Sequence, residues 1–186
     1  MRNKMQKFLI TLIVFFSSIL FSNSKPVAIV VHGGAGWFEN MPEGQVEGIM
    51  KGLEGSMNTG YEILINGGSS LDAVEQAIIL LENDPLFNAG KGAVYTSELR
   101  QELDASIMHG LNNNAGAVAS VTNVKNPISL ARYVMENTDH VMFSSRGAER
   151  VAKDAGLDIV YPSYFYQKDR LEDAKRIKKE KNKMGT

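Results

Sequence analysis

Two segments with one apolar face each limit what this chain can fold into. Between residues 44 and 65, and again between residues 69 and 81, apolar residues recur at spacings of three and four, the repeat of one helix face. The second helix is predicted to begin at Ser69, because Asp72 completes a capping box, and to end at Asp84, which precedes a proline. Each apolar face needs a second layer to cover it, so the chain requires a layered fold.

Short apolar runs on either side of these helices indicate β-strands. Residues 27–31 form a β-branched run that leads into the glycine-rich segment 32–36, and we expect a buried strand there. Further runs at 93–96, 103–108 and 115–122 are separated by turn residues, which predicts a strand meander.

The second half of the chain returns to helical patterns. Asn126 and Pro127 offer an N-cap followed by a proline at the first helical position. Another helix is expected to begin at Ser144 or Ser145 and to end by Gly156. The order of strand, two helices, strands and two helices predicts one α/β domain in which helices cover a sheet.

The first 24 residues have the three-part layout of a secretory signal peptide. Residues 1–7 carry three basic residues and no acidic one, and residues 8–21 are apolar at 11 of 14 positions. The small residues Ser22 and Ser24 suit a cut after Ser24. The alternative is an uncleaved membrane anchor, for which 14 residues are few against about 30 Å of hydrocarbon. We expect export to the periplasm, with cleavage near Ser24.

Composition excludes several classes of site. The chain has no cysteine, so it can form no disulfide, thiolate metal site or cysteine nucleophile, and its three histidines are scattered. The formal net charge is -1, and the segment after residue 24 carries 17 basic and 21 acidic residues. That balance gives no electrostatic case for binding nucleic acid.

The chain ends in a strongly charged segment. Residues 171–183 contain six basic and three acidic residues and almost no apolar ones. A solvated helix end or a flexible linker explains this pattern better than a binding patch. We expect residues 165–184 to act as a charged linker.

Glycine-rich turns suggest phosphate or oxyanion sites, but the surrounding residues do not support them. Residues 88–92 have glycine where a P-loop needs serine or threonine after the lysine. Residues 32–36 are similar to a lipase oxyanion loop, yet the chain has no G-x-S-x-G sequence. Standard serine, zinc and nucleotide machinery is therefore excluded.

Several segments, in the same order along the chain, resemble the plant-type L-asparaginase / isoaspartyl peptidase family. Each segment is short, and their common order makes the resemblance specific. They are residues 30–36 (VVHGGAG), 67–74 (GGSSLDAV), 83–94 (NDPLFNAGKGAV), 102–108 with 116–119, and 183–186 (KMGT).

This resemblance implies an N-terminal nucleophile hydrolase, with a four-layer αββα sandwich of which only the α-subunit half is present here. The precursor in this family cuts itself before a threonine, which implies a cut between Gly185 and Thr186 with Thr186 as the catalytic nucleophile. A threonine hydroxyl is a weak nucleophile, and the freed α-amine, with a pKa of about 8, is a base within its reach. Gly185 has no side chain and lets the peptide bend toward the hydroxyl.

The resemblance assigns further residues by position. His32, Gly33 and Gly34 match a loop near the cleavage site, although they also suit a tight turn after a strand. Asn88 matches an asparagine beside the nucleophile, and a plain turn residue explains it equally well. Glu102 and Asp104 share one face of a strand and could form a paired-carboxylate site, but we favour structural roles for them.

A loop in the family wraps a sodium ion with backbone carbonyls, and no organic cofactor is implied. Backbone oxygens suit a hard cation and leave little trace in the side chains. Lys91 adds a positive charge near this site, although its long stem can turn outward. By position the sodium carbonyls belong to Leu81, Glu82, Asp84, Phe87, Ala89 and Lys91.

One departure from the family is large. The β subunit, which follows the threonine and supplies the substrate-binding residues, is missing after Thr186, so we expect a truncated precursor that is inactive alone. The implied reaction is hydrolysis of β-aspartyl dipeptides and L-asparagine by a dimer of αβ units. An inactive remnant, or a non-catalytic module that binds a partner, is the alternative. Within the enzyme class the alternative is glycosylasparaginase.

Overall fold

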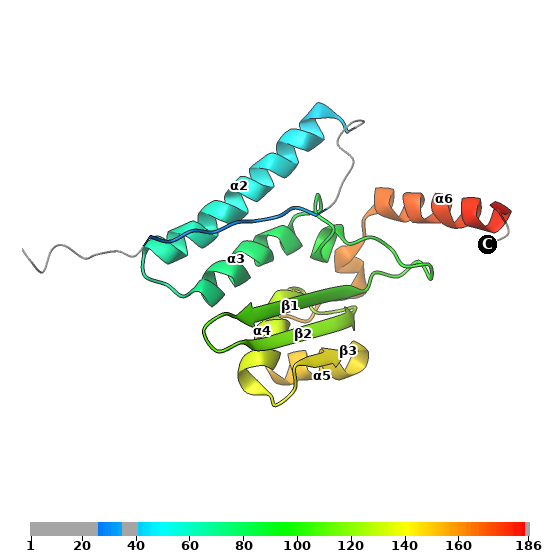
Figure 1. Cartoon of the computed structure of the whole chain (residues 1–186). Helices are drawn as coiled ribbons and strands as arrows, with labels where there is room; N and C mark the ends of the chain where they lie inside the picture. The colour runs from blue at the N-terminus through cyan, green and yellow to red at the C-terminus, as the bar shows by residue number, and fades with distance from the viewer. Residues whose placement is uncertain (1–25, 35–40, 185–186) are drawn as a thin grey trace, which may run out of the picture.

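The computed structural model describes residues 26–34 and 41–184 (Figure 1). The predicted signal peptide, Gly185 and Thr186 lie outside the described residues. The elements in chain order are α2 (Glu43–Ile65), α3 (Ser70–Asn83), the 3₁₀ helix η1 (Gly90–Gly92), β1 (Leu103–His109), β2 (Asn114–Val121), α4 (Pro127–Asn137), β3 (Met142–Ser144), α5 (Ser145–Asp154), the 3₁₀ helix η2 (Pro162–Phe165) and α6 (Lys168–Met184).

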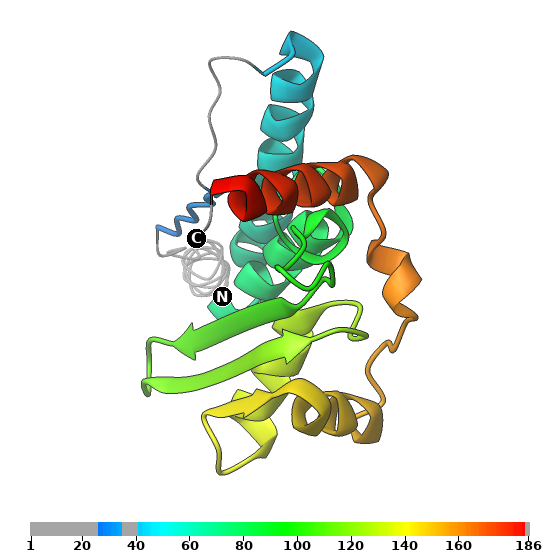
Figure 2. The ribbon, with the colours of Figure 1, turned by 90° about the vertical axis from the view of Figure 1, so that its right-hand side faces the viewer.

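The α2–α3 pair lies on the β1 side of a three-stranded sheet, and α5 lies on its β3 side (Figures 1 and 2). Its order is β1-β2-β3, with β1 and β2 antiparallel and β2 and β3 parallel. Helix α4 packs closely on the sheet at Gly116, where an added methyl group would clash with the Ala131 carbonyl oxygen. The predicted α/β class is confirmed.

The main hydrophobic core lies between this sheet and the helices α4 and α5. Val118 and Val121 of β2 pack there against Leu130 and Val134 of α4, and all four are almost fully buried. A smaller cluster of Ile49, Leu81 and Phe87 joins α2 and α3 to the loop that follows α3.

The opposite face of the sheet carries small or exposed side chains. Ser106 of β1 pairs with Ala117 of β2, and Ala117 pairs in turn with Met142 of β3, so the three side chains share this face. Met142 is 55% exposed, and Met108, which follows on the same face, is 61% exposed. Among the described residues the sheet is therefore covered by helices on one face only.

Small residues every four positions allow α2 to approach α3 closely. A methyl group added at Gly52 would lie 2.7 Å from the Phe87 ring. Ser56 is fully buried, and its hydroxyl donates to the Ala77 carbonyl of α3 at 2.8 Å. One turn further on, a methyl group added at Gly60 would clash with Ile29 and lie 3.0 Å from the Ala73 carbonyl oxygen. This stripe shows which side of α2 meets its neighbours.

The start of α3 agrees with the capping-box prediction and adds a link to α4. The Ser69 hydroxyl accepts from the Asp72 N–H at 3.1 Å. Arg132 of α4 reaches Asp72 and Glu75 at 2.7 Å each. Hydrogen bonds from Ser69 and then Arg132 hold the pKa of Asp72 below its usual value.

Two of the predicted strands are wrong. Residues 27–31 run extended across the α2–α3 pair, with Val30 90% exposed, and no described strand pairs with them (Figure 1). In the segment 93–96 the Thr96 N–H donates to the Arg100 carbonyl at 2.8 Å, so the chain closes into a turn. A β-branched run becomes a strand only where another strand supplies its hydrogen bonds.

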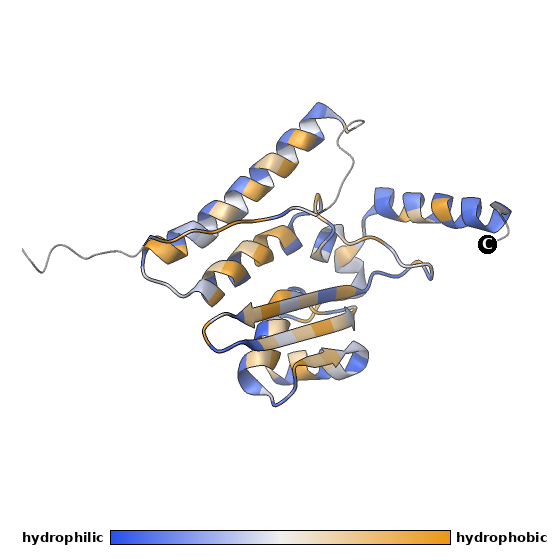
Figure 3. Cartoon of the chain, in the orientation of Figure 1, coloured by the Kyte–Doolittle hydropathy of each residue, from blue (hydrophilic) through white to orange (hydrophobic). Residues whose placement is uncertain are grey.

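The other predicted elements agree with the structure. The helices at 44–65, after Ser69 and near Ser145, and the strands at 103–108 and 115–122, are confirmed. The charged segment forms α6, which is mostly hydrophilic and points away from the sheet (Figures 1 and 3). Within the described ranges, no helix has the length and apolar character needed to cross a membrane.

Candidate functional site

The predicted sodium loop folds back onto the end of α3. Gly90 has a φ of +48°, and a methyl group there would clash with the Glu82 carbonyl oxygen. A methyl group at Gly92 would meet the carbonyls of Pro85 and Phe87, the former at 2.6 Å. The two glycines therefore allow the loop backbone to lie close against the carbonyls of Glu82, Pro85 and Phe87, where any larger residue would clash.

The predicted sodium carbonyls fall into two groups. Those of Leu81, Asp84 and Ala89 each accept one backbone N–H within the loop, at 3.3, 3.3 and 3.0 Å. Those of the other three residues accept no hydrogen bond from the described part of the chain. A carbonyl oxygen has two lone pairs, so both groups retain the capacity to bind a hard cation. The second group is Glu82, Phe87 and Lys91.

Asn88 has a local structural role in this loop. Its side-chain oxygen accepts from the Val94 N–H at 2.9 Å, which bridges the two ends of η1. The side chain is exposed. Its amide group thus stands at the surface of the loop while its oxygen fixes the loop's shape.

The structure brings the His32–Gly34 loop to residues 83–94, which we call the Asn88 loop. A side chain at Gly33 would touch Leu53 of α2 at 3.2 Å and the Phe87 ring at 3.3 Å. Phe87 precedes Asn88, so two segments far apart in the sequence meet here. The His32 ring nitrogen Nδ1 accepts from the Gly34 N–H at 3.0 Å, which fixes the tight turn.

Glu82 is a buried carboxylate whose side chain the sequence analysis did not single out. It is 3% exposed and accepts from the Ile128 N–H and from the Asn126 side chain at 3.0 Å each. Asn126 is at the predicted N-cap position of α4 but makes no cap, so Glu82 of α3 caps α4 in its place. Burial raises the pKa of Glu82 to about 7, although both hydrogen bonds favour the charged form. The sequence did contain one indication that Glu82 is buried. It follows the apolar Ile78 by four residues and therefore lies on the same face of the helix.

Gln101 is a second residue that the sequence analysis missed. Its side-chain amide nitrogen donates to the Ala93 and Phe165 carbonyls, at 2.8 Å each. A single glutamine in a polar stretch has no periodic signal, because its partners come from distant parts of the chain. Lys91 is half-buried, and its ammonium lies over the Tyr164 ring, 4.8 Å from the ring centre.

Glu102 and Asp104 do not form a paired-carboxylate site. Glu102 pairs with Arg100 at 3.2 Å. Asp104 accepts from the Ser120 N–H at 2.8 Å, next to an irregularity in the β1–β2 pairing. Both carboxylates serve the local structure, as favoured from the sequence.

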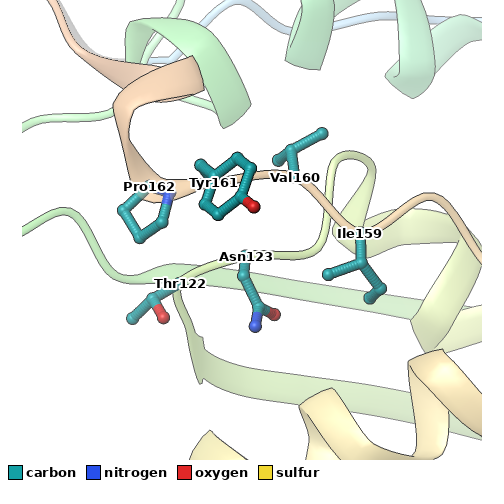
Figure 4. A pocket seen from close by; sticks show the side chains of 6 residues that line it. All are labelled: Thr122, Asn123, Ile159, Val160, Tyr161 and Pro162. Atoms are coloured by element: carbon teal, nitrogen blue, oxygen red, sulfur yellow. The ribbon is translucent and has the colours of Figure 1, made fainter.

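A pocket of about 400 Å³ lies away from these residues, between the end of β2 and the chain before η2 (Figure 4). The Asn123 side-chain oxygen is buried and has no hydrogen-bond partner among the described residues. None of the predicted site residues lines this pocket. Its lining is Thr122, Asn123, Ile159, Val160, Tyr161 and Pro162.

The structure gives no position for the predicted nucleophile, since Gly185 and Thr186 lie outside the described ranges. Helix α6, which precedes them, ends at Met184. Over the described residues, no three His, Cys, Asp or Glu side chains are grouped closely enough to hold a metal ion.

Comparison with known proteins shows which family and which relatives this chain is similar to. A family model described as asparaginase matches residues 24–185. The chain is 44% identical over 150 residues to a plant-type L-asparaginase of Pyrococcus furiosus, covering 81% of this chain and 48% of that protein. It is 47% identical over 131 residues to an isoaspartyl peptidase/L-asparaginase of Rattus norvegicus, covering 70% and 39%. A Xenopus laevis protein of the same name is 42% identical over 159 residues, covering 85% and 50%. The chain thus spans about half the length of the curated relatives it matches.

Proposed function

The chain belongs to the asparaginase family, and on that premise we propose that it is the front part of an isoaspartyl peptidase / L-asparaginase precursor. The precursor would cut itself between Gly185 and Thr186 and then hydrolyse β-aspartyl dipeptides and L-asparagine. The observation that carries this proposal is the family match over residues 24–185, whose relatives bear those two names. The part that follows Thr186 in the family would supply the β subunit, and two αβ units would form a dimer.

The open face of the sheet supports a four-layer αββα sandwich for the complete protein. Small and exposed apolar side chains such as Ala117, Met108 and Met142 cover this face, while helices cover the other. A second sheet stacked on it would bury these side chains at a spacing of about 10 Å. We place the β subunit of the proposed precursor there.

The proposed self-cleavage uses the Thr186 hydroxyl as nucleophile. The oxygen attacks the Gly185 carbonyl carbon, the C–N bond breaks and the amine takes the hydroxyl proton, which leaves an ester that water opens. The α-amine released on Thr186 then serves as the base for its hydroxyl during hydrolysis. The Asn88 loop and the His32–Gly34 loop, which the structure places together through Phe87, would flank this site.

We also propose that the loop after α3 holds a sodium ion through the carbonyls of Leu81, Glu82, Asp84, Phe87, Ala89 and Lys91. Gly90 and Gly92 fit this role, because a side chain at either position would clash with a carbonyl of the proposed set, Glu82 for Gly90 and Phe87 for Gly92. The ion would supply a fixed positive charge that keeps the carbonyls converging. Within the loop, the bond from Val94 to Asn88 would hold Asn88 in place.

Mass spectrometry of a completed precursor tests the proposal. The completed precursor is this chain continued past Thr186, by its own reading frame or by the matching part of the Xenopus laevis relative. We expect two products, divided between Gly185 and Thr186, and release of ammonia from asparagine. Thr186→Ala should abolish both, because it removes the attacking oxygen, and Thr186→Ser should retain some cleavage.

Two results would contradict the proposal. One is a precursor that is folded by circular dichroism and stays a single chain. The other is a Thr186→Ala variant that still divides at this bond. A folded precursor without cleavage or hydrolysis would favour the inactive remnant instead.

A further inference from the structure

Gln101 joins two parts of the chain that have separate roles in the proposed function. One of its acceptors, the Ala93 carbonyl, is next to Val94, whose N–H binds Asn88. Its other acceptor is the Phe165 carbonyl, at the end of η2 and three residues before α6. The bridge therefore runs from the Asn88 loop to the start of the segment that leads to Gly185.

The Phe165 end of this bridge is well anchored. Phe165 is 1% exposed and belongs to the main core. Next to it, the Tyr164 ring receives the Lys91 ammonium at 4.8 Å, and its hydroxyl donates to the Asn83 side chain at 3.4 Å. Asn83 and Lys91 both lie within the Asn88 loop (residues 83–94), so η2 packs against the loop that carries Asn88 (Figure 1). We call Tyr164 and Phe165 the linker root.

Beyond residue 174 the chain has little support from the rest of the molecule. From Lys175 to Lys183 every residue of α6 is exposed. Its ion pairs are within the helix itself, as between Arg176 and Asp173 at 2.8 Å. The Lys178 ammonium donates to the Ser97 carbonyl, in the body of the molecule, at 2.7 Å. Among the described residues, the linker root is thus the last buried anchor before the Gly185–Thr186 bond.

We propose that Gln101 is a positioning residue for self-cleavage, which fixes the linker root against the Asn88 loop through two hydrogen bonds. This inference rests on the proposed function. It assigns Gln101 to the step in which the linker must present the Gly185–Thr186 bond. Once that bond is cut, the linker end is free and hydrolysis no longer depends on where the linker begins.

The chemistry of the bridge predicts a specific order of variants. Both partners of Gln101 are carbonyl oxygens, so only an N–H donor can serve them. Gln101→Met keeps the shape and loses both donors. Gln101→Glu places carboxylate oxygens against two carbonyl oxygens, so it should slow self-cleavage more than Gln101→Met does. At a lower pH the carboxylate is protonated, which restores one donor.

The experiment follows the cleavage rate of the completed precursor by gel electrophoresis, at about pH 8 and about pH 5. We expect Gln101→Met to slow cleavage about tenfold and Gln101→Glu to slow it further at the higher pH, with partial recovery at the lower one. The loss in kcat of the fully cleaved enzyme should be at least about fivefold smaller than the loss in cleavage rate. Gln45→Glu, on the exposed surface of α2, is the matched control and should cleave normally.

Hydrogen exchange provides a readout that does not depend on activity. In a Thr186→Ala background, Gln101→Met should lower the protection of the Tyr164 and Tyr166 amides, which bond within η2. The inference is overturned if Gln101→Met leaves both protection and cleavage unchanged, or lowers cleavage and kcat equally. If the unmodified precursor does not cleave, the proposed function fails as well; if it cleaves and only the Gln101 effects are absent, this inference alone fails.

Discussion

At the scale of single residues, Glu82 shows how one side chain serves two helices. It lies in the last turn of α3 and accepts from the second residue of α4, where a carboxylate also meets the positive end of the helix dipole. Burial still outweighs these bonds and raises the pKa of Glu82 to about 7. The interaction between α3 and α4 therefore depends on pH.

Because burial raises the pKa of Glu82, the folded chain should become less stable as the pH rises. The ordinary pKa is 4.5, so between about pH 4.5 and 7 the unfolded state loses a proton that the folded state keeps. The free energy of unfolding should fall by up to about 3 kcal/mol over this range and then level off. Glu82→Gln, which stays neutral and can still accept from Ile128, should remove most of this fall. Urea unfolding at about pH 5 and about pH 8 measures it.

Glu62→Gln is the control for this measurement. Glu62 is exposed on α2 and should not affect the slope. A Glu82→Gln variant that loses as much stability with pH as the unmodified chain would show that Glu82 is ionised in both states.

At the scale of elements, the position of α2 depends on small or missing side chains along one side of the helix. The stripe of Gly48, Gly52, Ser56 and Gly60 lets the helix backbone lie against Phe87, Ala77 and Ala73. Glycine inside a helix costs about 0.5–1 kcal/mol of stability relative to alanine. Three glycines in one stripe are therefore acceptable only where the close packing that they allow offsets this loss. That closeness also sets Phe87, and with it the Asn88 loop, against α2.

Two glycines of α2 should respond in opposite ways to the same change. A methyl group at Gly52 would lie 2.7 Å from the Phe87 ring and 2.9 Å from the Asp84 carboxylate, whereas Gly55 has open space around it. Gly52→Ala should destabilise by about 1–3 kcal/mol, through overpacking. Gly55→Ala should stabilise by about 0.5–1 kcal/mol, through helix propensity. Thermal unfolding of the two variants compares them, and equal shifts of the same sign would exclude close packing at Gly52.

At the scale of the whole molecule, charge is unevenly distributed. Helix α6 carries eight basic and four acidic residues, while the segment from residue 25 onward carries 17 and 21 in total. The basic arm therefore projects from an acidic body. Ion pairs within α6, such as Lys168 with Glu172, are exposed and contribute little each.

We propose that the chain is exported and loses its first 24 residues. The family match begins at residue 24, which supports a separate role for the residues before it. In a bacterial host the periplasmic product should begin at Lys25, as read by N-terminal sequencing. Replacing two apolar residues, Ile13 and Val14, by arginine should keep the chain inside the cell, since the apolar run would be interrupted. A periplasmic product that still begins at Met1 would contradict cleavage.

The sequence by itself determined the features whose causes are local. The spacing of apolar residues defines α2 and α3, because a helix makes its hydrogen bonds within one segment. The Ser69 capping box spans three residues and was predicted for the same reason. The resemblance of residues 83–94 to the family depends on residue identity alone. The structure adds that this segment folds back on the end of α3.

Only the tertiary structure decided the features whose partners are distant in the chain. Residues 27–31 have the composition of a strand, but pairing depends on a neighbour that no local pattern encodes. Glu82 became a buried cap because α4, 46 residues later, lies against it, and Gln101 became a bridge because Phe165 is 64 residues away. Side-chain roles of this kind arise from the packing of elements, whereas sequence periodicity describes each element alone.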